Sequence, residues 1–150
     1  MIIREIMTRD PCCCLPSDSA HRAASLMRRF DIGALPVVDD EYHRRLLGIV
    51  TDRDLCLFVV AANRVSAEVT VEECMMRNPV CCAPDDDVCR ALELLRVHHV
   101  HRLPVVNSHG LLVGMVSLTD LVRHHAISQA DLETAMEVLS QPAPLAPGRD

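Results

Sequence analysis

The chain alternates between segments whose apolar residues recur every three or four positions and shorter segments rich in β-branched residues. The first pattern predicts amphipathic helices, and the second predicts strands joined by polar turns. Ser19 and Asp87 stand directly before two helical segments and are residue types that cap helix N-termini. The predicted helices cover 20–30, 52–62, 88–95, 118–125 and 128–140, with short helical turns near 4–7 and 71–75. The predicted strands cover 12–15, 34–38, 46–50, 80–83, 103–106 and 111–116.

The second half of the chain repeats the first. Of the 32 positions from Met7 to Val38, 15 carry the same residue type as the position 68 further on. After a loop shortened by two residues, Gly48 and Asp54 correspond to Gly114 and Asp120 at an offset of 66. Each copy has the element order β-α-β-β-α. We therefore predict an α/β (α+β) fold in which two such repeats are related by a pseudo-twofold axis.

The repeat divides the chain into five expected parts. The first repeat is expected at 1–62, a linker at 63–70 and the second repeat at 71–126. A further helix is expected at 127–140, and a disordered Pro-rich tail at 141–150.

Composition restricts the classes of function. Apolar residues make up 49 % of the chain and charged residues 24 %, which is ordinary globular usage and excludes wholesale disorder. The net charge of −6 and the aromatic content of 2 % argue against a nucleic-acid-binding surface. The longest apolar run has eight residues, Leu55 to Ala62, against about 20 for a membrane-spanning helix. Because residues 1–10 also lack the apolar centre of a signal peptide, we expect a cytoplasmic protein with reduced cysteines.

One motif with chemical potential recurs in both copies. An apolar strand ends at Thr51 or Ser117, and an acid, Asp54 or Asp120, follows three positions later as a helix begins. This spacing is that of a capping box, in which both residues satisfy free N–H groups at the helix start. The same geometry suits a nucleotide, because an ionised Asp can accept two hydrogen bonds from a ribose diol and a helix start favours phosphate. Spacing alone leaves capping and ligand binding open.

The two halves, each with Leu-Pro-Val-Val followed by Gly-x-x-[Thr/Ser]-x-x-Asp, resemble a tandem pair of cystathionine-β-synthase (CBS) domains, called a Bateman module. The resemblance covers residues 3–126. The segments from Phe30 to Pro36 and from Thr51 to Asp54 are similar to stand-alone bacterial members of the hypoxic response protein type. The resemblance implies a non-catalytic regulatory module that binds an adenosine-containing ligand (AMP, ADP, ATP, NAD or S-adenosylmethionine) in the cleft between the repeats. It also implies no obligatory cofactor, a homodimer and a separate protein target.

The resemblance further implies two related binding sites. In the first, Asp54 would bind the ribose beside Thr51 and Arg53. Arg102 from the second repeat would reach the phosphate, to which Arg offers a bidentate contact. The residues expected to approach the adenine of the two sites are Met7, Thr8, Asp10, Met76 and Asn78.

In the second site, Asp120 would bind the ribose with Ser117 and Thr119 nearby, and His101 would contact the phosphate. The first repeat has Gly-Ala where the second has His101-Arg102, so the two sites are expected to be unequal. The backbone expected to line the base pocket is that of Ile32, Gly33 and Ala34.

The cysteines and histidines leave an alternative open. Neighbouring residues of a strand point to opposite faces, so neither Cys12–Cys14 nor Cys81–Cys82 can supply all ligands of one tetrahedral ion. Buried apolar packing is the ordinary role of a free cysteine. A thiol- or metal-responsive structural module with vacant nucleotide sites remains the alternative function. No paired general base and nucleophile are evident, so we predict no enzyme activity.

The helices at 52–62 and 118–125 are the expected homodimer surface. Leu55, Leu57, Phe58 and Val59 make the first of these helices more apolar than a lone module needs. Neither a membrane nor a nucleic acid is expected as a partner.

Overall fold

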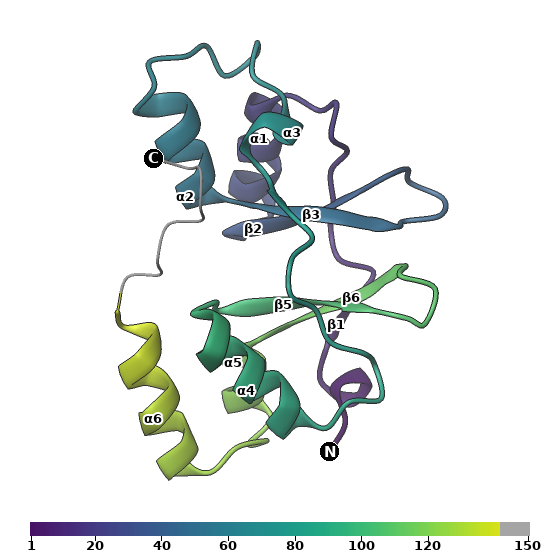
Figure 1. Cartoon of the computed structure of the whole chain (residues 1–150), viewed down its shortest axis with the longest axis vertical. Helices are drawn as coiled ribbons and strands as arrows, with labels where there is room; N and C mark the ends of the chain where they lie inside the picture. The colour runs from purple at the N-terminus through teal and green to yellow at the C-terminus, as the bar shows by residue number, and fades with distance from the viewer. Residues whose placement is uncertain (142–150) are drawn as a thin grey trace. The chain divides into compact units, whose positions relative to one another are not determined.

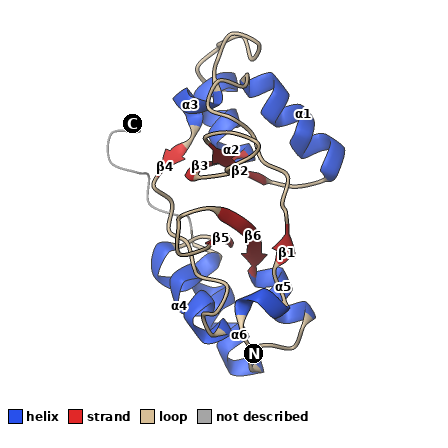
Figure 2. Cartoon of the chain, turned by 90° about the vertical axis from the view of Figure 1, so that its right-hand side faces the viewer, coloured by secondary structure: helices blue, strands red, loops and turns tan. Residues whose placement is uncertain are grey.

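The computed structural model describes residues 1–141, and the tail expected at 141–150 lies outside the described residues except for Gln141. The chain forms two compact units. The first-repeat unit comprises Asp10–Pro79 and Ser108–Leu112. The second-repeat unit comprises Met1–Arg9, Val80–Asn107 and the described residues from Val113 onward. Each unit has a three-stranded sheet with helices on one face (Figures 1 and 2), which confirms the predicted α/β fold of two repeats.

The first-repeat unit contains α1 (Ala20–Phe30), β2 (Ala34–Val38), β3 (Leu46–Thr51), α2 (Asp52–Leu55), the π-helix η2 (Cys56–Val60), α3 (Val71–Cys74) and β4 (Met76–Arg77). Its antiparallel sheet has the strand order β2-β3-β4. The core between this sheet and its helices includes Leu35, Val37 and Val50, and α1 adds the buried side chains of Ala23 and Met27.

The second-repeat unit contains η1 (Ile3–Glu5), β1 (Thr8–Arg9), α4 (Val88–His98), β5 (Arg102–Val106), β6 (Leu112–Ser117), α5 (Leu118–Arg123) and α6 (Gln129–Leu139). Its sheet has the strand order β1-β6-β5. The core includes Leu95, Leu103 and Val116, and α6 reaches it through Ala135 and Leu139.

The third strand of each sheet comes from the leading segment of the other repeat. The leading segment is η1 with β1 in the first repeat and α3 with β4 in the second. β1 belongs in sequence to the first repeat, yet its Thr8 pairs with Met115 of β6. β4 belongs in sequence to the second repeat, yet its Met76 pairs with Ile49 of β3.

The helical turns before these strands follow the same rule. The backbone N–H of Ile3 donates to the carbonyl of Asp86 at 2.9 Å, and that of Val71 donates to the carbonyl of Asp18 at 2.8 Å. Each unit therefore combines the body of one repeat with the leading segment of the other.

Both predicted N-caps are confirmed. The Ser19 side chain accepts a hydrogen bond from the N–H of Arg22 at 3.0 Å, and the Asp87 carboxylate accepts one from the N–H of Cys89 at 2.8 Å. This backbone hydrogen bond lowers the pKa of Asp87. Such caps satisfy N–H groups that a helix start otherwise leaves without partners.

The cysteine segments differ from the prediction of strands at 12–15 and 80–83. Only isolated parallel bridges form there among the described residues, between Cys14 and Val37 and between Cys82 and Val105. To extend the parallel ladder, the next donors would have to be Pro16 or Pro36 in the first repeat and Pro84 or Pro104 in the second. Proline has no N–H, so pairing does not extend beyond one residue.

The helix predicted at 52–62 is shorter and faces the core more fully than expected. Its regular part is α2, which continues as η2 and ends at Val60. Leu55 and Val59 are buried, because residues four positions apart share a helix face and that face packs on the core. The prediction that these two belong to a homodimer surface is therefore wrong, whereas Leu57 is 41 % exposed.

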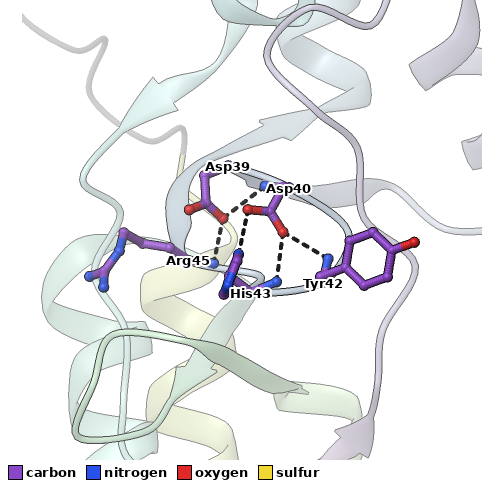
Figure 3. A network of polar contacts seen from close by, with 5 residues as sticks. All are labelled: Asp39, Asp40, Tyr42, His43 and Arg45. Carbon is purple, nitrogen blue, oxygen red and sulfur yellow. Dashed lines mark hydrogen bonds and ion pairs between the residues drawn. The ribbon is translucent and has the colours of Figure 1, made fainter.

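The turn between β2 and β3 is held by two aspartates (Figure 3). Asp39 Oδ1 accepts hydrogen bonds from the N–H groups of Asp40 and Arg45, both at 2.8 Å. Asp40 Oδ1 accepts from the N–H groups of Tyr42 and His43, at 2.8 and 2.6 Å, and Asp40 Oδ2 lies 2.8 Å from His43 Nδ1. These bonds fix the turn locally, independently of the hydrophobic core.

The residues that the structure describes include no helix long and apolar enough to cross a membrane.

Candidate functional site

The corner where β3 meets α2 brings Thr51 and Asp54 together. Thr51 Oγ1 accepts a hydrogen bond from the N–H of Asp54 at 3.1 Å, and Asp54 Oδ2 accepts one from the N–H of Thr51 at 2.9 Å. The two residues form a capping box, and both are half-buried. The capping interpretation of the motif is therefore confirmed for the first repeat.

The corner where β6 meets α5 has the same arrangement. Ser117 Oγ accepts from the N–H of Asp120 at 3.2 Å and donates to Asp120 Oδ2 at 2.8 Å. Asp120 Oδ2 also accepts from the N–H of Ser117 at 2.8 Å. In both corners the capping bond that the Asp carboxylate accepts ends on Oδ2. Capping by itself does not exclude a sugar hydroxyl as a further donor to the carboxylate.

In the first-repeat unit, the segment Ile32–Ala34 lies beside this corner. Ala34 pairs with Thr51 across the sheet, and the N–H of Asp52 donates to the carbonyl of Gly33 at 3.0 Å. Ile32 packs against the core. The sequence analysis expects this backbone to line the base pocket of the site at Asp120. The structure brings it next to Thr51, and its part in the Asp120 site stays a prediction.

In the second-repeat unit, the equivalent contact is made by His101. Its carbonyl accepts a hydrogen bond from the N–H of Leu118 at 3.1 Å. His101 is exposed and Arg102, the first residue of β5, is half-buried. This corner therefore has two basic side chains where the first-repeat corner has Gly33 and Ala34.

The leading segments supply a third side to each corner. Met76 pairs with Ile49 of β3, two positions before Thr51. Thr8 pairs with Met115 of β6, two positions before Ser117, and Met7 packs against the core of the same unit. The structure thus places Met76 with the Asp54 corner, and Met7 and Thr8 with the Asp120 corner.

Asp10 and Asn78 occupy equivalent positions and share an unusual backbone conformation. Their φ angles are 45° and 48°, in the left-handed region that Asp and Asn tolerate better than other side chains do. The carboxylate of Asp10 lies 3.7 Å from Arg44 Nη1, and Arg44 Nη2 donates to the carbonyl of Pro11 at 2.7 Å. These residue types therefore have a backbone role in the turn after each short strand.

Arg53 and Thr119 are exposed, each two positions after the capping residue of its helix. Neither takes part in the capping box of its corner. Their contact with a ligand stays a prediction, as does that of Arg102 with the phosphate of a ligand at Asp54.

Two glycines that the site prediction omitted make the three-sided corners possible. A Cβ atom at Gly48 would lie 2.6 Å from the carbonyl oxygen of Met76, and one at Gly114 would lie 2.6 Å from Met7 Sδ. A larger residue at Gly48 would push β4 away, and one at Gly114 would displace the Met7 side chain. Both glycines are visible in the Gly-x-x-[Thr/Ser]-x-x-Asp motif, but their partner segments are not.

The cysteines of the segments 12–14 and 81–82 are placed for packing more than for chemistry. Cys14 and Cys82 are buried, each in the core of its own unit. Burial raises the pKa of each of these two thiols to about 12 and also raises the pKa of Cys12, Cys13 and Cys81. Since the thiolate is the reactive and metal-binding form, these residues are predominantly thiols at neutral pH.

Within residues 1–141, no group of three or more His, Cys, Asp and Glu side chains is arranged to hold a metal ion.

Comparison with known proteins identifies the family. The model of the CBS domain matches residues 3–61 and 71–126, so the chain belongs to the CBS domain family and carries two copies of the domain. It is 35 % identical over 138 residues to the uncharacterized protein YlbB of Bacillus subtilis (strain 168). That match covers 92 % of this chain and 88 % of YlbB.

Solved structures of the same family are also similar. Hypoxic Response Protein I, crystallised with two coordinated zinc ions, is 31 % identical with a TM-score of 0.75, over 83 % of this chain and 98 % of that one. CBSX2 of Arabidopsis thaliana in complex with AMP is 26 % identical with a TM-score of 0.71, over 83 % and 95 %. The CBS domain pair of protein MJ0100 in complex with 5′-methylthioadenosine and S-adenosyl-L-methionine is 27 % identical with a TM-score of 0.74, over 83 % and 95 %.

Proposed function

We propose that the protein is a non-catalytic regulatory module that binds an adenosine-containing ligand: AMP, ADP, ATP, NAD or S-adenosylmethionine. The observation that carries the proposal is the twofold recurrence of one corner, in which a half-buried Asp stands three residues after a hydroxyl residue at a strand end. The AMP and S-adenosyl-L-methionine complexes of the similar proteins CBSX2 and MJ0100 support the choice of ligand class.

In this proposal, Asp54 and Asp120 accept hydrogen bonds from the ribose hydroxyls. Capping engages Oδ2 of each carboxylate, and this role does not by itself exclude a sugar hydroxyl as a further donor. Arg102 supplies positive charge, and His101 a hydrogen-bond donor, for a phosphate or carboxylate of the ligand.

Regulation follows if the ligand binds one arrangement of the protein more tightly than another, because only such a difference can shift a conformational equilibrium. A homodimer and a separate protein target, both implied by the family resemblance, are the proposed recipients of that shift.

Calorimetric titration of each nucleotide into the wild type, Asp54→Asn, Asp120→Asn and the double variant tests the proposal. Asn keeps the side-chain oxygen that caps the helix but loses the charge, so the fold should be retained. Loss of a charged hydrogen bond worth about 1.5–3 kcal/mol should weaken binding at the altered corner roughly 10- to 100-fold. Asp52→Asn is the matched control, since Asp52 is exposed in the same turn and accepts a hydrogen bond from the N–H of Arg53.

A 2′,3′-dideoxy analogue sharpens the test of the ribose contact. It should bind the wild type weakly and the Asn variants no more weakly than the parent nucleotide does. Corresponding Ala variants should also lose about 1 kcal/mol of stability, the ordinary contribution of a helix cap. A flat heat trace for all five ligands, or unchanged affinity in the double variant, would overturn the proposal. Heat from Zn²⁺ in that case would favour the metal-responsive alternative.

A further inference from the structure

Arg44 has a left-handed backbone in the turn between β2 and β3. Its φ is 58°, and Gly110, the equivalent residue of the second repeat, has a φ of 75°. The equivalence follows from the offset of 66 that relates Gly48 to Gly114. Glycine adopts this conformation without a steric penalty, whereas an arginine is strained there. The first repeat therefore carries a side chain at a position that favours a residue without one.

The backbone around these two residues pairs in the same way in both turns. The N–H of Leu46 donates to the carbonyl of Gly110 at 3.1 Å, and the N–H of Leu112 donates to the carbonyl of Arg44 at 2.7 Å. All four residues belong to the first-repeat unit. The backbone contacts are therefore symmetric, whereas the Arg44 side chain has no counterpart at Gly110.

The Arg44 side chain lies against the residues that follow β1. Its Nη2 donates to the carbonyl of Pro11 at 2.7 Å, and its Nη1 lies 3.7 Å from the carboxylate of Asp10. The Arg44 side chain is only 20 % exposed, whereas that of Asp10 is 88 % exposed. Exposed ion pairs contribute little and hydrogen bonds from a charged donor are strong. The bond to Pro11 is therefore the contact that fixes this side chain.

Pro11 and Leu112 stand at the outer end of the antiparallel β1–β6 ladder. Arg9 pairs with Gly114, and the same register two positions further out would bring Pro11 opposite Leu112. The strand β1 itself stops at Arg9. Arg44 takes up the next two bonding groups, since its side chain donates to Pro11 and its carbonyl accepts from Leu112. These two hydrogen bonds, named the Arg44 clamp, close the ladder at its outer end.

The β1–β6 pair forms two sides of the Asp120 corner. β6 ends at Ser117, which forms the capping box with Asp120, and β1 begins at Thr8. A strand of two residues has few bonds of its own, so a contact at its end has a large effect on how often it opens. Gly110 supplies no such contact to the β3–β4 pair of the Asp54 corner, because it has no side chain.

We propose that Arg44 is a positioning residue for the Asp120 corner, and that the Arg44 clamp holds β1 in place for the ligand. The inference rests on the proposed adenosine-binding function and adds that the two corners differ in preorganisation. The Asp120 corner is the tighter site, because less ordering is required when the ligand binds there.

Amide hydrogen exchange of the protein without ligand tests the clamp. Arg44→Met removes the donor to Pro11 and keeps a long side chain. Arg44→Gly also relieves the backbone strain, so it should fold even if Arg44→Met does not. In both variants the amides that pair β1 with β6 should exchange about tenfold faster, the effect of losing a charged hydrogen bond. The amides that pair β4 with β3 should not change. Arg44→Lys retains a donor and should restore most of the protection.

Calorimetric titration with AMP as the probe tests the positioning role. In an Asp54→Asn background, which leaves the Asp120 corner intact, Arg44→Met should weaken AMP binding about tenfold and Arg44→Lys should restore most of it. In an Asp120→Asn background, Arg44→Met should leave the AMP affinity of the Asp54 corner unchanged. Arg45→Met is the matched control, because Arg45 is exposed in the same turn and donates to the carbonyl of His109 at 3.2 Å instead of to Pro11. It removes the same charge and should leave AMP binding unchanged.

The outcomes separate this inference from the proposed function. Unchanged exchange of the β1–β6 amides in Arg44→Met and Arg44→Gly overturns the clamp, whether or not AMP binds. Faster exchange with an equal loss of AMP affinity at both corners, or with no loss at either, overturns the positioning role while ligand binding stands. A flat heat trace for AMP in the wild type contradicts the proposed function for this ligand and the positioning role with it, and exchange then decides the clamp alone.

Discussion

At the scale of single residues, Gly48 and Gly114 decide whether the leading segments can approach the corners. The two sites look equivalent in sequence, but the atoms that crowd them differ. At Gly48 the nearest atom to an added Cβ is the backbone oxygen of Met76, at 2.6 Å. At Gly114 it is Sδ of Met7, the far end of a flexible side chain, with the Thr8 oxygen at 3.0 Å. A side chain can rotate away, whereas a strand must shift.

Gly48→Ala should therefore be more destabilising than Gly114→Ala. Overpacking of a filled site costs about 1–3 kcal/mol, and we expect Gly48→Ala in the upper part of that range and Gly114→Ala in the lower part. Thermal or urea unfolding of the two variants beside the wild type measures the difference. Hydrogen exchange at Met76 and Asn78 should rise in Gly48→Ala alone. Equal losses of stability in the two variants would contradict the distinction between backbone and side-chain crowding.

At the scale of elements, the turn between β2 and β3 is the clearest case of a structure held by titrating groups. The hydrogen bond that the His43 ring donates to the Asp40 carboxylate raises the pKa of His43, and the backbone hydrogen bond from the His43 N–H lowers the pKa of Asp40. Asp39 and Arg45 are the other charged groups that act on His43, with opposite signs. The raised pKa of His43 means that its contribution is full at low pH and is lost as pH rises through that pKa. The lowered pKa of Asp40 means that its contribution is lost as pH falls through that pKa.

The turn should therefore be most ordered at mildly acidic pH, between the two pKa values. An NMR titration of the His43 ring should show a midpoint above that of an unperturbed histidine. In Asp40→Asn, which keeps the Oδ1 acceptor for Tyr42 and His43 but loses the charge, the midpoint should fall. The remaining imidazole signals are the internal reference. An unchanged His43 midpoint in Asp40→Asn would mean that the contact seen in Figure 3 has no electrostatic effect.

Elements that carry their own local signal were predictable from the sequence. Ser19 and Asp87 are short polar residues before apolar helical runs, and each caps the helix that its position predicts. The lengths of the strands at 12–15 and 80–83 were not, because each is a short extended run whose ladder would need donors at proline positions, in the run's own flank and in the partner strand. The burial of Leu55 and Val59 was also not predictable, because an apolar helix has the same sequence pattern whether it packs on its own core or on a second chain.

At the scale of the whole molecule, the sequence repeat predicted that the corner occurs twice. It did not predict which leading segment contributes to each corner. A motif that recurs with its hydroxyl and acid at fixed spacing identifies Thr51 with Asp54 and Ser117 with Asp120 from the sequence alone. The exchange of leading segments is different, because Thr8 and Met115 are far apart in the chain and no local pattern links them. Either leading segment has the composition to pair with either sheet. Pairing is decided by three-dimensional packing, which a period in the sequence does not encode.

The exchange of leading segments predicts that a substitution in the leading segment of one repeat destabilises the body of the other repeat. Ile3 belongs in sequence to the first repeat but is fully buried in the core with Leu95 and Leu103. Ile3→Ala should cost about 2–5 kcal/mol, and hydrogen exchange should show the loss of protection in α4, β5 and β6. Val71, the equivalent residue 68 positions further on, is fully buried with Leu35 and other residues of the first-repeat core.

Val71→Ala is therefore the reciprocal variant, with a smaller cost because fewer methylene groups are removed, and its loss of protection should fall in α1, β2 and β3. The two variants control for each other, since both truncate a buried aliphatic residue in a helical turn that docks through two backbone hydrogen bonds. Local unfolding free energies differ between cooperative units, so exchange can resolve which unit each substitution loosens. If Ile3→Ala loosened α1, β2 and β3 instead, each leading segment would stabilise its own repeat, and the assignment of Met7 and Thr8 to the Asp120 corner would fall with it.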